Sequence, residues 1–267
     1  QMNAHFATRL RDADGAPLDL MARVQSAADM SPTAGQMPRL VGLGYASRLY
    51  RELPGLEEFG AFSHGGNEIA FGTIGNASTA EGHFWEAVNA IGVLRAAVLL
   101  SIWDDGYGIS VANEFQICKA DLSEMLSGFG RKAGGDEGFE LYRVCGWDYP
   151  ALVDTYLTAA ERVRRDHVPA IVHVAEVTQP QGHSTSGSHE RYKSTERLAF
   201  EVEFDGLRRM RSWMLAEGLA SERELDAIES ESAEAARSAQ RRSWDAFQEA
   251  IRADKEIFTG LAGRVAE

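Results

Sequence analysis

The segment that most constrains the fold of this chain spans residues 68–110, where two short apolar runs flank a helical pattern. The first run, residues 69–74, has the length of a buried strand. Apolar residues then recur at helical spacing after Ser78 and Glu81, which stand three apart as in a capping box. The second run covers residues 97–103. A strand, a helix and a strand of these lengths form a βαβ unit, so we expect parallel strands joined by a right-handed crossover.

Polar residues follow both of these predicted strands. Asn76 comes directly after the first strand, and Asp105 comes after the second. Because parallel strands release their following loops at one edge of the sheet, we expect both side chains there, beside the N-terminus of the helix. An amide oxygen, a carboxylate and a further backbone carbonyl beyond Asp105 are ligands suited to Mg²⁺. The segment therefore predicts a site for a metal ion and a diphosphate.

The rest of the chain extends this pattern into an α/β fold. We expect a doubly wound, mainly parallel sheet with helices on both faces, and a helical C-terminal tail. We assign residues 1–193 to the binding domain and residues 194–267 to the helical extension. The further elements that we expect are helices over 34–51 and 150–166, strands over 139–144 and 170–178, and an irregular segment over 113–138.

Composition excludes several classes of partner. The formal net charge of −13 argues against nucleic acid and anionic membranes, and it means that a diphosphate needs a cation beside it. No apolar run approaches the 18 residues of a membrane span, and nothing resembles a signal peptide. The two cysteines lie far apart, which favours a reducing compartment. We expect a cytoplasmic protein, or one of the mitochondrial matrix in a eukaryote.

The motifs also resemble a known family. The 29 positions between Asn76 and Asp105 resemble the spacing between GDG and NN in thiamine-diphosphate enzymes, and Asp105 begins a stretch similar to NGYAIS. Within that superfamily the chain resembles the alpha subunit of the decarboxylating component of 2-oxoacid dehydrogenase complexes, with the branched-chain type closest. The resemblance covers residues 28–254. Its other motifs are SPTAGQMP at 31–38, VCGWD at 144–148, similar to VDGND, and the HSTS loop at 181–186.

This resemblance implies a thiamine-diphosphate-binding fold and oxidative decarboxylation of a 2-oxo acid, with acyl transfer to a lipoyl carrier. A branched-chain 2-oxo acid is the favoured substrate, and pyruvate is the other. The implied partners are a beta subunit, or the beta half of a fused chain, and a lipoyl-bearing acyltransferase. The implied Mg²⁺ ligands are Asn76, Asp105 and Tyr107. The implied cofactor contacts are Ser31, Thr33, Gly75, Asn76, Ala77, Ser78, Asp105, Tyr107 and His183.

Some of these residues have simpler explanations in the sequence alone. From the sequence alone, His183 is more simply a solvated loop histidine, although histidine titrates near neutral pH and suits proton transfer or phosphate contact. Ser31 and Thr33 read equally as caps of the helix that follows them. The family resemblance gives His183 a catalytic role beside the reacting part of the cofactor, and it assigns Ser31 and Thr33 to cofactor contacts.

The chain departs from the family at the metal ligands. The family has an acidic residue where this chain has Asn76, and asparagine where it has Asp105. Because the inversion keeps one carboxylate and one amide, the charge facing the metal is unchanged. The sequence therefore predicts that exchanging both residues back, Asn76→Asp with Asp105→Asn, preserves much of the metal affinity. Asp104 adds a negative charge that the family lacks at this position.

Two other functions are compatible with the fold. One is a different thiamine-diphosphate enzyme, such as a transketolase-like one, although the HSTS loop favours the dehydrogenases. The other is a non-catalytic scaffold, supported by Asn76 and by the lack of the segment that precedes residue 1 in the family. That lack indicates a fragment, or half of a fused alpha–beta polypeptide. We therefore expect no activity from this chain without its beta partner.

Overall fold

The structure is a computed structural model that describes residues 7–27, 32–132, 135, 137–183 and 188–266. The chain divides into two compact units, Gln1–Met210 and Arg211–Glu267. Residues 194–210 belong to the first unit, and the expected division into a binding domain and a helical extension after residue 193 stays a prediction. Lys193 and Arg197 make polar contacts within this unit, which are given below.

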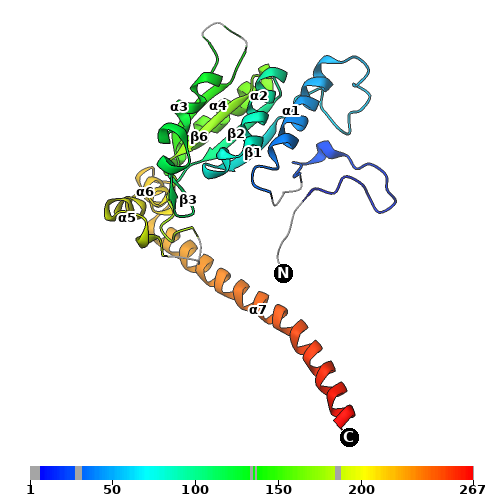
Figure 1. Cartoon of the computed structure of the whole chain (residues 1–267), viewed down its shortest axis with the longest axis vertical. Helices are drawn as coiled ribbons and strands as arrows, with labels where there is room; N and C mark the ends of the chain where they lie inside the picture. The colour runs from blue at the N-terminus through cyan, green and yellow to red at the C-terminus, as the bar shows by residue number, and fades with distance from the viewer. Residues whose placement is uncertain (1–6, 28–31, 133–134, 136, 184–187, 267) are drawn as a thin grey trace. The chain divides into compact units, whose positions relative to one another are not determined.

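The first unit is built on a four-stranded parallel sheet (Figure 1), which confirms the predicted fold class. Its strand order is β1-β2-β6-β5, and all three neighbouring pairs are parallel. The register aligns Gly75 at the end of β1 with Trp103 at the end of β2. The loops that carry Asn76 and Asp105 therefore leave the sheet at the same height. The strands are β1 (Ala70–Gly75), β2 (Val98–Trp103), β5 (Glu140–Cys145) and β6 (Ala170–Ala175).

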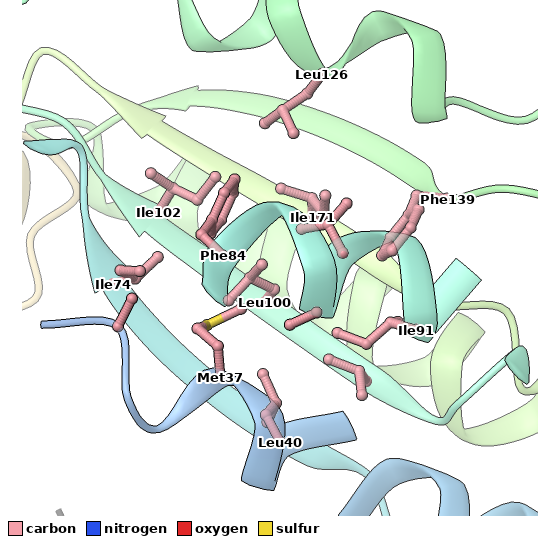
Figure 2. Packing of buried hydrophobic residues seen from close by; sticks show 14 of the residues in the cluster. Met37, Leu40, Ile74, Phe84, Ile91, Leu100, Ile102, Leu126, Phe139 and Ile171 are labelled. Atoms are coloured by element: carbon pink, nitrogen blue, oxygen red, sulfur yellow. The ribbon is translucent and has the colours of Figure 1, made fainter. Parts of the chain in front are cut away.

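Helices cover both faces of this sheet. The helices α1 (Met37–Glu52), α2 (Gly82–Leu94) and α3 (Leu122–Leu126) pack on one face, and α4 (Tyr149–Asp166) packs on the other. Figure 2 shows the first of these cores, where Phe84 and Ile91 of α2 lie against sheet residues. Phe84 is fully buried, so the helix that follows the Asn76 loop has a fixed position on the sheet.

The segments around the predicted site differ in detail from the expectations. Ser78 lies in a 3-10 turn, η2 (Ala77–Ala80), and α2 begins only at Gly82, with Glu81 as an N-cap that makes no side-chain capping bond. The expected capping box is therefore wrong, because Ser78 lies in the turn and Glu81 itself occupies the N-cap position of α2. The segment expected to be irregular holds η3 (Asn113–Phe115), η4 (Cys118–Ala120), α3 and η5 (Ser127–Phe129), and follows a short hairpin, β3 (Tyr107–Gly108) and β4 (Val111–Ala112).

The remaining elements are mainly helical, as predicted for the C-terminal part. They are η1 (Leu20–Ala22), η6 (His189–Arg191), α5 (Thr195–Glu203), α6 (Gly206–Ala216) and α7 (Glu222–Ala266). Within the second unit, Arg211 forms ion pairs of 2.6 Å with Asp226 and 2.9 Å with Glu229. Among the helices that the structure describes, none combines the length and the apolar composition needed to cross a bilayer.

Two glycines of α1 provide a matched test of how closely this helix packs on the sheet. A Cβ at Gly44 would lie 2.5 Å from Cγ2 of Val98 and 3.2 Å from the backbone of Ala97, whereas a Cβ at Gly42 would meet nothing within 4 Å. We expect Gly44→Ala to lower the free energy of unfolding by about 1–3 kcal/mol through overpacking. Gly42→Ala should raise it by about 0.5–1 kcal/mol through helix propensity. Urea unfolding of both variants checks this, and equal effects would contradict the packing.

Candidate metal and diphosphate site

The predicted site lies at the carboxyl edge of the sheet, where β1, β2 and β6 end. The backbone N–H of Asn76 donates to the carbonyl of Trp103 at 3.0 Å, and the N–H of Asp104 donates to the carbonyl of Val174 at 2.9 Å. These bonds extend the parallel ladders by one residue into the loops. The backbone of both loops is therefore fixed by the sheet before any side chain contributes.

The three predicted metal ligands come together at this edge. Nδ2 of Asn76 donates to the backbone oxygen of Tyr107 at 3.0 Å, and the N–H of Tyr107 donates to Oδ1 of Asp105 at 3.0 Å. The loops approach so closely that a Cβ at Gly108 would lie 2.7 Å from Cβ of Ala77. The loop after β1 thus contacts the loop after β2 through Asn76 and Tyr107, as the predicted parallel pairing requires.

Asp105 lies in a buried and mostly cationic setting. Its Oδ2 accepts a hydrogen bond of 2.8 Å from Gln179, and its backbone oxygen accepts one of 2.8 Å from the guanidinium of Arg197. Burial raises the pKa of the Asp105 carboxyl, while the Tyr107 N–H and the charges of Lys193 and Arg197 oppose this shift. A divalent cation beside Asp105 would favour the ionised form in the same way.

The cations beside Asp105 are held by a buried carboxylate. Nζ of Lys193 lies 2.7 Å and 2.9 Å from the two carboxylate oxygens of Glu201, and Arg197 donates to the same group at 2.9 Å. Glu201 is fully buried. The Tyr107 ring lies beneath Lys193, at 5.3 Å from Nζ to the ring centre, and 5.7 Å from the ring of Tyr192. The start of α5 is thereby connected to the loop after β2 that holds Asp105 and Tyr107.

A second polar network lies behind Asn76. Nδ2 of Asn76 donates to Oδ1 of Asn113 at 2.7 Å, and Nδ2 of Asn113 donates to Oδ1 of Asp104 at 2.9 Å. Oδ2 of Asp104 lies 3.0 Å from Nε2 of His173, whose Nδ1 lies 2.6 Å from the hydroxyl of Ser123. Burial opposes ionisation of Asp104, but the bonds from His173, Asn113 and Gly106 outweigh it and lower its pKa.

Sequence reasoning found Asp104 only as an additional charge and missed its partners. His173 carried the clearest signal, because it interrupts an otherwise apolar strand and a polar group in a buried strand needs a partner. Asn113, Gln179 and Arg197 carried none, since each reaches the site from a different segment. Lys193 and Glu201 stand eight positions apart, a spacing that does not by itself predict contact.

For the other predicted site residues, the structure gives exposure and position in the chain. Thr33 and Gly75 are exposed, and Ala77 and Ser78 are half-buried in the turn beside the loop after β2. His183 is exposed on the loop after β6, the loop whose Gln179 contacts Asp105. Ser31 lies outside the described residues. The grouping of Asn76, Asp105 and Tyr107 is therefore the part of the predicted site that has defined geometry.

The available oxygens fit a hard cation. Asn76 uses its nitrogen for both of its side-chain hydrogen bonds, which leaves Oδ1 for a ligand. The described residues contain no group of three or more His, Cys, Asp or Glu side chains arranged to hold a metal ion. One carboxylate with amide and carbonyl oxygens suits Mg²⁺ that also binds phosphate, and argues against a transition metal.

Comparison with known proteins identifies the family of the chain. Residues 11–251 match the family model described as dehydrogenase E1 component. The chain is 29% identical over 166 residues to pyruvate dehydrogenase E1 component subunit alpha of Rickettsia bellii, covering 62% of this chain and 48% of that protein. It is 23% identical over 195 residues to 2-oxoisovalerate dehydrogenase subunit alpha of Bacillus subtilis, covering 72% and 51%. The chain thus spans about half the length of the curated relatives it matches.

Proposed function

Because this chain belongs to the dehydrogenase E1 component family, we propose that it is the alpha part of a thiamine-diphosphate-dependent 2-oxoacid dehydrogenase. It would bind the magnesium diphosphate end of the cofactor. The observation that carries this proposal is the contact of Asn76, Asp105 and Tyr107 at one edge of the sheet. These residues come from two loops and supply oxygen ligands of the kind that Mg²⁺ takes.

In this proposal each residue at the sheet edge has a defined task. Asp105 supplies the one negative charge to Mg²⁺, and Asn76 and Tyr107 supply an amide oxygen and a backbone oxygen. Gly75, Ala77 and Ser78 border the diphosphate at the turn before α2, with Ser31 and Thr33 as further cofactor contacts. When bound, thiamine diphosphate supplies a carbanion at its thiazolium ring, which protein side chains cannot offer.

His183 has a different task in the proposed reaction. It follows β6 on the loop whose Gln179 already contacts Asp105, so it belongs to the same edge of the sheet. Its side chain is exposed, as a group that meets a substrate or a partner must be. We assign it the role of a general acid, or of an orienting contact, for the substrate and the arriving lipoyl group.

The proposed substrate is a branched-chain 2-oxo acid, with pyruvate as the alternative. The HSTS loop supports the first, whereas relatives of similar identity carry the names of both enzymes. The proposed partners are a beta subunit, or beta half, and a lipoyl-bearing acyltransferase. We place the reaction in the cytoplasm, or in the mitochondrial matrix of a eukaryote.

Turnover in the complete assembly tests this function. We expect Mg²⁺-dependent and thiamine-diphosphate-dependent decarboxylation, with a higher kcat/KM for 2-oxoisovalerate than for pyruvate. His183→Ala should reduce acyl transfer by about 10²-fold or more while changing cofactor affinity little. His64→Ala, in a loop before β1, is the matched control and should leave both unchanged. An assembly that binds the cofactor but decarboxylates neither acid would contradict the proposal.

A further inference from the structure

A chain of hydrogen bonds connects the loop after β2 to Asn76, and the donor and the acceptor of each bond are determined by its neighbours. Its starting point is the backbone N–H of Gly106, which donates to Oδ1 of Asp104 at 2.8 Å. A backbone N–H can only donate, so this carboxylate oxygen is an acceptor. Asn113 approaches the same oxygen at 2.9 Å and must therefore present its NH₂ group to it.

The orientation of the Asn113 amide determines the orientation of the Asn76 amide. With its nitrogen committed to Asp104, Asn113 presents its carbonyl oxygen to Asn76, 2.7 Å away. Asn76 must then present its own nitrogen. The backbone oxygen of Tyr107, which can only accept, lies 3.0 Å from that same nitrogen and imposes the same orientation. Asn76, Asp104 and Asn113 are all buried, and buried polar groups need hydrogen-bond partners.

We propose that Asp104 and Asn113 are positioning residues that fix the amide of Asn76 with its nitrogen inward and its oxygen toward the cation. This inference rests on the proposed function only in its last step, the presence of a cation. The network itself follows from the contacts alone. It requires at position 76 a side chain of this length that donates inward and accepts outward, which asparagine does and an ionised aspartate does not.

The network explains why the acidic and amide residues are exchanged. An aspartate at position 76 would place a carboxylate oxygen against two acceptors, Oδ1 of Asn113 and the carbonyl of Tyr107, at the distances of the present bonds. The negative ligand must then come from the neighbouring loop, at Asp105. The two exchanges are therefore coupled through Asp104. This reverses the expectation from sequence: Asn76→Asp with Asp105→Asn should restore little of the affinity.

Thermal unfolding of the full chain without metal tests the network. We expect Asn76→Asp to lower Tm by about 5 °C or more, because it introduces two acceptor–acceptor contacts in a buried site. Asn89→Asp, which adds the same charge at an exposed position of α2, is the matched control and should change Tm by less than about 2 °C. If Asn76→Asp matches this control, the network does not orient Asn76.

A double-mutant cycle covers the case in which Asn76→Asp fails to fold. Asn113→Ala removes one of the two facing acceptors, so the loss in Asn76→Asp/Asn113→Ala should be smaller than the sum of the single losses. If Asn76→Asp is unfolded, the double variant should recover folded protein. Additive losses, or no recovery, would overturn the proposal.

Binding of Mn²⁺ with thiamine diphosphate separates this inference from the proposed function. Asn113→Ala should weaken Mn²⁺ binding about tenfold or more, as loss of an outer partner of a metal ligand does, in electron paramagnetic resonance titrations of the full chain. Unchanged Mn²⁺ affinity in Asn113→Ala would refute the positioning role. Lack of Mn²⁺ binding by the unaltered chain together with its beta partner would contradict the proposed function, while the unfolding cycle would still decide the network.

Discussion

Replacement of Asp105 by Asn should weaken Mg²⁺-dependent binding of thiamine diphosphate on the order of a hundredfold. The variant keeps the size of the side chain and removes the one carboxylate among the three proposed ligands. Removing one partner of a buried charge pair costs about 3 kcal/mol or more, and each 1.4 kcal/mol is tenfold in affinity. Calorimetric titration with Mg²⁺ and thiamine diphosphate measures the change.

The same variant should not destabilise the fold, which distinguishes a ligand from a structural residue. Burial raises the pKa of Asp105, so the folded chain accommodates its ionised form less well than water does. Removing that charge should leave Tm unchanged or raise it. Asp154→Asn, exposed on α4, removes an equal charge away from the site and should affect neither binding nor Tm. Full cofactor affinity in Asp105→Asn would exclude Asp105 as a ligand.

The sequence predicted that Asn76 and Asp105 lie at one edge of the sheet, because that placement depends on local patterns. The apolar runs of β1 and β2 and the helical spacing of α2 require a parallel pair, and a parallel pair brings Asn76 and Asp105 to one edge. No contact with a more distant segment of the chain is needed for this prediction. The predicted capping box was wrong because local spacing is ambiguous. Two residues three positions apart fit a 3-10 turn as well as the first turn of an α-helix.

The sequence did not predict what surrounds these two residues, because that depends on contacts between distant segments. Asn113 reaches Asp104 only after the β3–β4 hairpin, and Arg197 reaches Asp105 from a helix 92 positions along the chain. The direction of a hydrogen bond also has no signature in residue types. In the sequence, exchanging the amide and the carboxylate between positions 76 and 105 leaves the total charge unchanged. The contacts of Asn113 and Tyr107, however, require a hydrogen-bond donor at position 76.

The isolated chain, residues 1–267, should be catalytically silent although it contains the proposed metal ligands. Its described residues include three buried carboxyl groups, those of Asp104, Asp105 and Glu201. Asp104 is bound by His173 and Asn113, and Glu201 by Lys193 and Arg197. Asp105 is the proposed ligand of Mg²⁺. The described part of the chain therefore holds no uncommitted buried acid that could exchange a proton with the aminopyrimidine of the cofactor.

A beta partner would supply that acid in the family that the motifs resemble, and loss of a general acid or base costs about 10²–10⁴-fold in rate. We therefore expect decarboxylation of 2-oxoisovalerate by the isolated chain to be about 10³-fold or more below that of the complete assembly. Release of CO₂ is measured for both at saturating Mg²⁺ and thiamine diphosphate, so that weak cofactor binding does not determine the difference. Adding the beta partner should restore the rate. Rapid decarboxylation by the chain alone would contradict this prediction and would mean that one of the three buried carboxyl groups can exchange a proton with the cofactor despite its contacts.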